Sequence, residues 1–138
     1  MRRSGLRIIG SRGNPVVARS CVRYARWLRR NYDFPIRVPV YLAPGKTVRC
    51  HDGREGSASF FGPFRRDEEP FICIATGDYE ELLAERGRDN ALAAYLHSFS
   101  HEVLHYLQWL KKGRASERGV NRTASRMVEK YAQTTRHP

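Results

Sequence analysis

The chain contains little cysteine and no long hydrophobic run. Its three cysteines, Cys21, Cys50 and Cys73, stand singly, without Cys-x-x-Cys spacing. This pattern argues against a disulfide framework and fits a reducing compartment. No apolar run approaches the roughly 18 residues of a membrane-spanning helix, and the basic N-terminus is not followed by the apolar segment of a secretory signal. We therefore expect a cytoplasmic protein with no transmembrane segment.

Acidic residues are also scarce. The chain has 14 of them and 25 lysines and arginines, which gives a net charge of +11. Such an excess favours attraction to nucleic acid, to an acidic protein or to an anionic membrane surface.

Asn14-Pro15 resembles a helix N-cap followed by proline at the first helical position, which predicts a helix to about residue 31. Four exposed positions of that helix, here called the arginine face, carry Arg19, Arg23, Arg26 and Arg30. They either bind phosphate groups or form a solvated surface.

The remaining composition is that of one folded domain. The chain has 138 residues, of which 41% are hydrophobic and 11% aromatic, enough for a single core over residues 1–138. Residues 1–13 form a basic arm, with a short strand predicted at Leu6–Ile9. Residues 134–138 are predicted to be a frayed tail.

The middle of the chain has the pattern of β-strands. Apolar residues alternate over 36–42, and Pro39 within this segment predicts an edge position or a bulge. A turn then predicts a hairpin with residues 47–50, and a third strand is expected over 57–64. The segment 70–75 shows no alternation, which predicts a strand covered on both faces.

Helices follow the strands. A short helix is predicted over residues 79–85, and a long helix capped by Asp89 or Asn90 ends at Gly113. A last helix, capped by Ser116, is expected to run antiparallel to the long one, because the connection is short. The order predicts an α+β fold with an N-terminal helix, a small twisted antiparallel or mixed sheet of three to four strands, and two C-terminal helices.

The long helix carries the motif His-Glu-x-x-His at residues 101–105. Residues four apart share one helix face, so His101 and His105 can bind one Zn²⁺ together. Glu102 lies on an adjoining face, where it can reach a metal-bound water. The motif could also arise by chance, but both histidines lie off the apolar positions of the helix, which are Leu92, Leu96, Phe99, Val103, Leu107 and Leu110.

A catalytic zinc takes three protein ligands and leaves a fourth position for water. If the last two helices pair about residues 113 and 114, Asn121 comes level with His105 and Ser125 comes level with His101. Neither is a carboxylate. Glu117 is expected about one helical turn nearer the connection.

The segments His101–Trp109 and Ser116–Ala124 resemble small bacterial and phage zincin-type metallopeptidases, the minimal gluzincins akin to the ImmA/IrrE and SprT-like groups. The resemblance covers about the last third of the chain. It implies a zincin-like fold and zinc-dependent peptide hydrolysis, in which Glu102 is the general base for a zinc-activated water. In such families the third ligand is typically a glutamate at the position that Asn121 occupies here.

Three interpretations of the third ligand remain open. Glu117 reaches the metal, or Asn121 offers its amide oxygen, or the site binds metal poorly and the protein is a degenerate relative with a binding role. Two further residues lie near the motif. His97 either supports the ligands, touches substrate or is a partly exposed helix histidine, and Tyr106 either stabilises an oxyanion or packs against the last helix.

The leading hypothesis is therefore a zinc metallopeptidase acting on a peptide or protein. The resemblance also implies that residues 71–75 form an edge strand that pairs with an extended peptide, although they could equally be plain core. The alternative is a catalytically degenerate zincin-fold protein that binds nucleic acid or an acidic protein through its basic surface.

Overall fold

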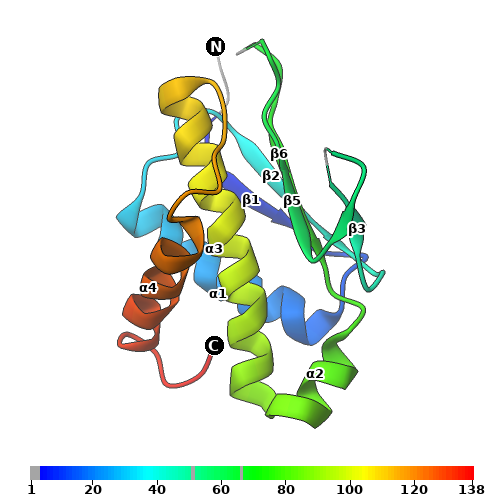
Figure 1. The fold of residues 1–138 in the computed structure, drawn as a ribbon. Coiled ribbons are helices and arrows are strands. Elements are labelled where there is room, and N and C mark those ends of the chain that lie inside the picture. The colour runs from blue at the N-terminus through cyan, green and yellow to red at the C-terminus, as the bar shows by residue number, and fades with distance from the viewer. Residues whose placement is uncertain (1–3, 51, 66) are drawn as a thin grey trace.

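The computed structural model describes residues 4–50, 52–65 and 67–138, so residues 1–3 of the basic arm lie outside it. Within the described residues, helices cover one face of a sheet (Figure 1). In chain order the elements are β1 (Leu6–Ile9), α1 (Pro15–Asn31), β2 (Val38–Ala43), β3 (Val48–Arg49), β4 (Glu55–Gly56), β5 (Ala58–Phe61), β6 (Phe71–Ala75), α2 (Tyr79–Arg86), α3 (Arg88–Lys112) and α4 (Val120–Ala132).

The main sheet is mixed and has four strands in the order β1-β2-β6-β5. β1 pairs parallel with β2 and β2 pairs parallel with β6, whereas β5 is antiparallel to β6. β3 and β4 form a separate two-stranded antiparallel sheet. The predicted α+β class with a mixed sheet is therefore confirmed.

The predicted hairpin between β2 and residues 47–50 is wrong, because both neighbours of β2 are parallel strands. Pro39 accordingly lies in an inner strand and not at an edge. The Val38 amide donates to the Gly5 carbonyl, so the backbone groups of Val38 point toward β1. Because backbone groups alternate in direction along a strand, the backbone nitrogen of Pro39 points toward β6. The pairing of β2 with β6 begins only at Val40 with Ile72. Proline thus occupies a place where the ladder requires no donor.

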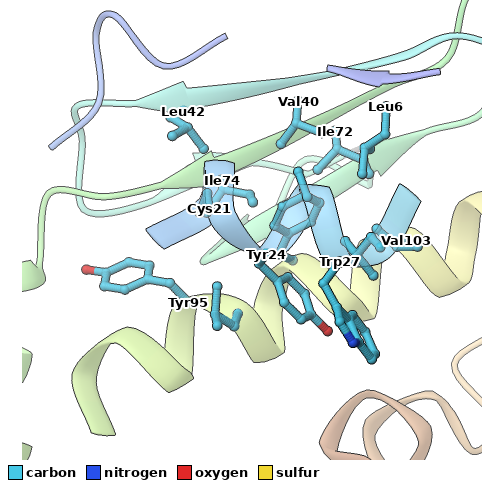
Figure 2. Packing of buried hydrophobic residues seen from close by; sticks show 14 of the residues in the cluster. Leu6, Cys21, Tyr24, Trp27, Val40, Leu42, Ile72, Ile74, Tyr95 and Val103 are labelled. Carbon is cyan, nitrogen blue, oxygen red and sulfur yellow. The ribbon is translucent and has the colours of Figure 1, made fainter. Parts of the chain in front are cut away.

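The core lies between the sheet and helices α1 and α3. Figure 2 shows side chains from β1, β2 and β6 pointing toward Cys21, Tyr24 and Trp27 of α1 and toward Val103 of α3. The opposite face of the sheet is only partly covered, because Tyr41 is 43% exposed. Phe71 and Cys73 on that face are half-buried. The prediction that residues 70–75 are covered on both faces is therefore wrong.

The two C-terminal helices pair antiparallel, and α4 packs against α3 on the side away from the sheet (Figure 1). α3 ends at Gly113 in the left-handed region, with φ of 74°, as predicted. Its N-cap is Gly87 and neither Asp89 nor Asn90. α4 begins at Val120 after Gly119, so the predicted Ser116 cap is also wrong.

The later start of α4 changes which residues are level with the motif. Glu117 lies in the non-helical connection before α4, and Asn121 lies level with His101 and not with His105. The side chain of Ser116 accepts a hydrogen bond from the Arg118 amide within the connection. Because the connection is longer than predicted, the paired positions shift by about one helical turn.

The end of the chain has defined contacts, although we predicted a frayed tail over residues 134–138. Arg23 donates to the Thr135 hydroxyl over 3.0 Å and to the Pro138 carbonyl over 3.5 Å. His137 lies 3.0 Å from the Asp89 carboxylate at the start of α3. These contacts hold the tail against α1 and α3.

Among the described residues, no helix has both the length and the apolar character needed to cross a membrane.

Tyr106 connects α3 to the segment between α1 and β2. Its ring stacks on Phe34 with centroids 5.6 Å apart, and it is fully buried. The hydroxyl accepts a hydrogen bond from the Ile36 amide over 3.1 Å and donates to the Ile36 carbonyl. One side chain thus satisfies two backbone groups just before β2.

We predict that Tyr106→Phe lowers the free energy of unfolding by about 1–3 kcal/mol, because the buried Ile36 groups lose this hydroxyl. Urea unfolding measures the change. Tyr41→Phe is the matched control, since Tyr41 is 43% exposed, and it should leave stability nearly unchanged. Equal stability of the two variants would contradict the anchoring role of the Tyr106 hydroxyl.

Candidate metal centre

The two motif histidines lie side by side on α3, as their spacing predicts. Their ring centroids are 4.7 Å apart. His105 is buried, and the His101 side chain is 19% exposed. Both rings are one helical turn apart on the face of α3 that meets the connection to α4. The pair therefore faces a returning segment of the chain and not the apolar core.

The carboxylate of Glu117 meets both imidazoles. Its Oε1 atom lies 2.8 Å from Nε2 of His105, and its Oε2 atom lies 3.0 Å from Nε2 of His101. Two imidazole nitrogens and one carboxylate are a donor set typical of catalytic zinc sites, which leave one position open. The residues present therefore fit a zinc ion by their chemistry and their convergence.

The far side of each ring is held by an amide oxygen. His101 Nδ1 lies 2.9 Å from Oδ1 of Asn121, and His105 Nδ1 lies 3.1 Å from Oε1 of Gln108. Amide and carboxylate oxygens only accept, so each Nδ1 donates to its amide and each Nε2 donates to Glu117, and a bound metal would take the place of the Nε2 hydrogens. Asn121 thus orients His101 from behind, on the side opposite Nε2.

Glu102 is the buried acid of the site, with only 6% of its surface exposed. Its carboxylate and the ring nitrogens of His101 and His105 lie within 4.8 Å of one another. Burial, reinforced by the nearby negative charge of Glu117, raises the pKa of Glu102 to about 8. A carboxyl that titrates near neutral pH can both accept and release a proton. Glu102 lies close enough to the histidines to be a ligand itself, but Glu117 is the carboxylate that contacts both Nε2 atoms directly.

A cleft of about 670 Å³ opens onto these residues. One wall is α3, with Trp109 beside the histidines, and the other is β5, with Ala58, Ser59 and Phe60. β5 is the edge strand of the main sheet, whereas β6 is an inner strand. The expectation that residues 71–75 form the edge strand beside the site is therefore wrong, and β5 takes that place.

Two residues that we expected near the chemistry lie elsewhere. His97 contacts the backbone carbonyl of Asn121 over 3.3 Å and is not among the residues that line the cleft. It is half-buried and contacts the start of α4, in agreement with the alternative of a partly exposed helix histidine. Tyr106 is buried beneath α3 against Phe34 and Ile36, so neither the oxyanion role nor packing against the last helix holds.

The arginine face lies on α1, and all four of its residues are exposed. None of the four lines the cleft. Arg23 donates hydrogen bonds to Thr135 and Pro138 at the chain end, whereas the side chains of Arg19, Arg26 and Arg30 make no hydrogen bond or ion pair within the described residues. The face is thus separate from the candidate metal centre.

Gln108, Cys50 and Arg114 lie at or beside the cleft but were not among the predicted site residues. Gln108 follows His105 by three positions, a spacing that brings side chains together on a helix and was a usable signal. Cys50 and Arg114 reach the cleft from loops, and nothing in their local sequence indicates this. Burial, followed by the charges of Asp52, Glu102 and Glu55, raises the pKa of Cys50, so its thiol stays protonated at neutral pH.

The chain matches no protein-family model, no curated protein and no solved structure.

We predict that Glu117 is the third ligand and that Asn121 orients His101. Glu117→Ala and His101→Ala should each abolish stoichiometric zinc binding. Asn121→Ala should weaken it by about 10–100-fold, the usual effect of removing an orienting partner. Metal analysis and chelator competition on the purified variants measure this. Zinc retained by His101→Ala would refute the site, and a larger loss in Asn121→Ala than in Glu117→Ala would make Asn121 the ligand.

Proposed function

We propose that this protein is a zinc-dependent metallopeptidase of the minimal gluzincin type, as the resemblance of its motif segment implies. The observation that carries the proposal is the position of the Glu117 carboxylate, which contacts Nε2 of both motif histidines. A chance His-Glu-x-x-His sequence has no reason to be met by a carboxylate from a different segment. The third member of the donor set is thus supplied although position 121 is an asparagine.

His101, His105 and Glu117 would hold the metal. When bound, zinc lowers the pKa of a coordinated water to near 7 and polarises the carbonyl under attack. Glu102 accepts the proton of the attacking water on its carboxylate and delivers it to the nitrogen of the leaving amine. Burial raises the pKa of this carboxyl to about 8 in the metal-free protein, close enough to neutral pH for proton exchange.

The outer edge of β5, which the β3–β4 sheet partly flanks, supports an extended peptide as the substrate. The Ser57 carbonyl accepts a hydrogen bond from the Ala75 amide, so the backbone groups of Ser59 and Phe61 also point toward β6. The backbone groups of Ala58 and Phe60 point away from β6. The Ala58 carbonyl already accepts from the Cys50 thiol over 3.5 Å. Phe60 presents its backbone amide and carbonyl toward the cleft side, where a peptide strand can add to the sheet.

The proposed location is the cytoplasm. All three cysteines are free, and a reducing compartment keeps them so. A peptide or protein is the proposed substrate, and the net charge of +11 favours an acidic one.

We predict that Glu102→Gln retains zinc and loses hydrolysis by about 10²–10⁴-fold, because the amide cannot accept the proton. A peptide-cleavage assay on zinc-loaded protein measures this. Glu129→Gln, an exposed position on α4, is the matched control and should keep full activity. At pH 7 the same Glu102 variant, freed of metal, should unfold at higher urea concentration, because folding of the wild type must protonate this carboxyl, whereas the unfolded chain ionises it freely. Unchanged hydrolysis in Glu102→Gln would exclude it as the base.

A second candidate function is a basic binding module for nucleic acid. It is favoured by the arginine face, because α1 contains no acidic residue over its 17 positions. In this case the zincin helix serves as a scaffold, and the charges on α1 contact phosphate groups.

We predict that binding of this kind weakens steeply between about 50 and 200 mM salt, since counterions are released from the phosphates. Replacing both Arg19 and Arg26 by Gln should reduce the salt dependence. Fluorescence anisotropy with duplex and single-stranded oligonucleotides measures the affinity. If neither oligonucleotide binds at the lowest salt concentration, the alternative is lost.

A further inference from the structure

We infer that Gln108 is a positioning residue. Its side-chain oxygen orients two proposed metal ligands, His105 and Glu117. The inference rests on the proposed zinc site. Oε1 of Gln108 accepts a hydrogen bond from the Ser116 amide over 2.8 Å and lies 3.1 Å from Nδ1 of His105. The two partners of this oxygen thus belong to α3 and to the connection that carries Glu117.

The identity of the shared atom follows from its partners. A backbone amide only donates, so the Gln108 atom facing Ser116 must be the oxygen and not the side-chain nitrogen. His105 Nδ1 faces the same oxygen and therefore carries a hydrogen. In consequence Nε2 of His105 points away from Gln108, toward Oε1 of Glu117 at 2.8 Å. The orientation of His105 is fixed from one side by Gln108.

The connection that bears Glu117 needs such an attachment. It runs between Gly113 and Gly119, which both adopt a φ of 74°, and the Glu117 side chain is 75% exposed. Its internal hydrogen bonds, from Arg118 to the Ser116 hydroxyl and from Val120 to the Glu117 carbonyl, do not reach α3. The Ser116 amide does so through Gln108. Since Ser116 precedes Glu117 directly, this bond places the carboxylate beside the histidines.

An amide suits this position chemically. Its oxygen has two lone pairs and can accept from both donors at once, yet it adds no charge. A carboxylate could accept the same two bonds but would add a third negative group near Glu102 and Glu117. A thioether of similar size accepts hydrogen bonds only weakly. These differences define the variants that separate positioning from simple packing.

Zinc affinity, measured by competition with a chromogenic chelator, tests the inference. Gln108→Met should weaken binding by about 10–100-fold, the range found for orienting partners of metal ligands. Gln108→Glu, which restores the acceptor, should recover most of the lost affinity. Gln133→Met, at the only other glutamine of the chain, should match the wild type. Wild-type affinity in Gln108→Met, or equal losses in Gln108→Met and Gln108→Glu, would overturn the inference.

A double-mutant cycle tests the coupling to Glu117. If Gln108 acts through Glu117 as well as His105, the affinity lost in Gln108→Met should be smaller when Glu117 is already glutamine, whose amide oxygen remains a weak ligand and keeps the affinity measurable. The loss that remains in that background reports the effect through His105. An identical loss in both backgrounds would refute the coupling to Glu117.

Hydrogen exchange of the metal-free protein separates this inference from the proposed function. The Ser116 amide should exchange faster in Gln108→Met than in the wild type, while amides of the core strand β2 keep their protection. Protection in β2 also verifies that the variant is folded. If the wild type binds no zinc, the proposed function fails, but faster exchange at Ser116 still supports the attachment by Gln108. Unchanged exchange at Ser116 refutes it.

Discussion

The contact of one carboxylate with two imidazole Nε2 atoms is the interaction on which the functional interpretation depends. It requires three separate conditions. α3 must run unbroken through residues 101–105, so that both rings share a face. The chain must turn back after Gly113, which its left-handed conformation permits. The rings must also present Nε2 and not Nδ1, which Asn121 and Gln108 ensure through their amide oxygens. Removing any one of these conditions leaves two histidines without a third donor.

The hydrophobic pattern predicted much of this architecture. The α+β class, α1 with its Asn14 cap, and the end of α3 at Gly113 all follow from local sequence. Strand pairing does not, because the parallel pairs depend on long connections: α1 lies between β1 and β2, and β3, β4 and β5 lie between β2 and β6. Pro39 was misleading for that reason, since whether it costs a hydrogen bond depends on a neighbour far away in sequence. The start of α4 was placed too early because Ser116 looks like a cap but bonds within the connection.

That one error of position also explains the uncertainty about the third ligand. With α4 starting at Ser116, Glu117 would lie on a helix a full turn from the histidines. With α4 starting at Val120, the same residue lies in a loop free to reach them. Glu102 and the histidines were predictable, because their spacing is fixed by the helix alone. Tyr106 was not, because its hydroxyl partner at Ile36 is 70 residues away in the chain.

The placement of Glu117 between two glycines has a thermodynamic consequence for any metal that binds here. His101 and His105 are held on a long helix before binding, so their contribution requires little loss of conformational freedom. Glu117 lies on an exposed loop that the hydrogen bond from Ser116 to Gln108 holds in place, and any change that loosens this loop adds an ordering cost that opposes binding. Affinity and the rate of metal release therefore depend on the sequence between Gly113 and Gly119, outside the motif itself. Evolution or design could thus change how tightly the ion is retained without altering a single residue of the His-Glu-x-x-His segment.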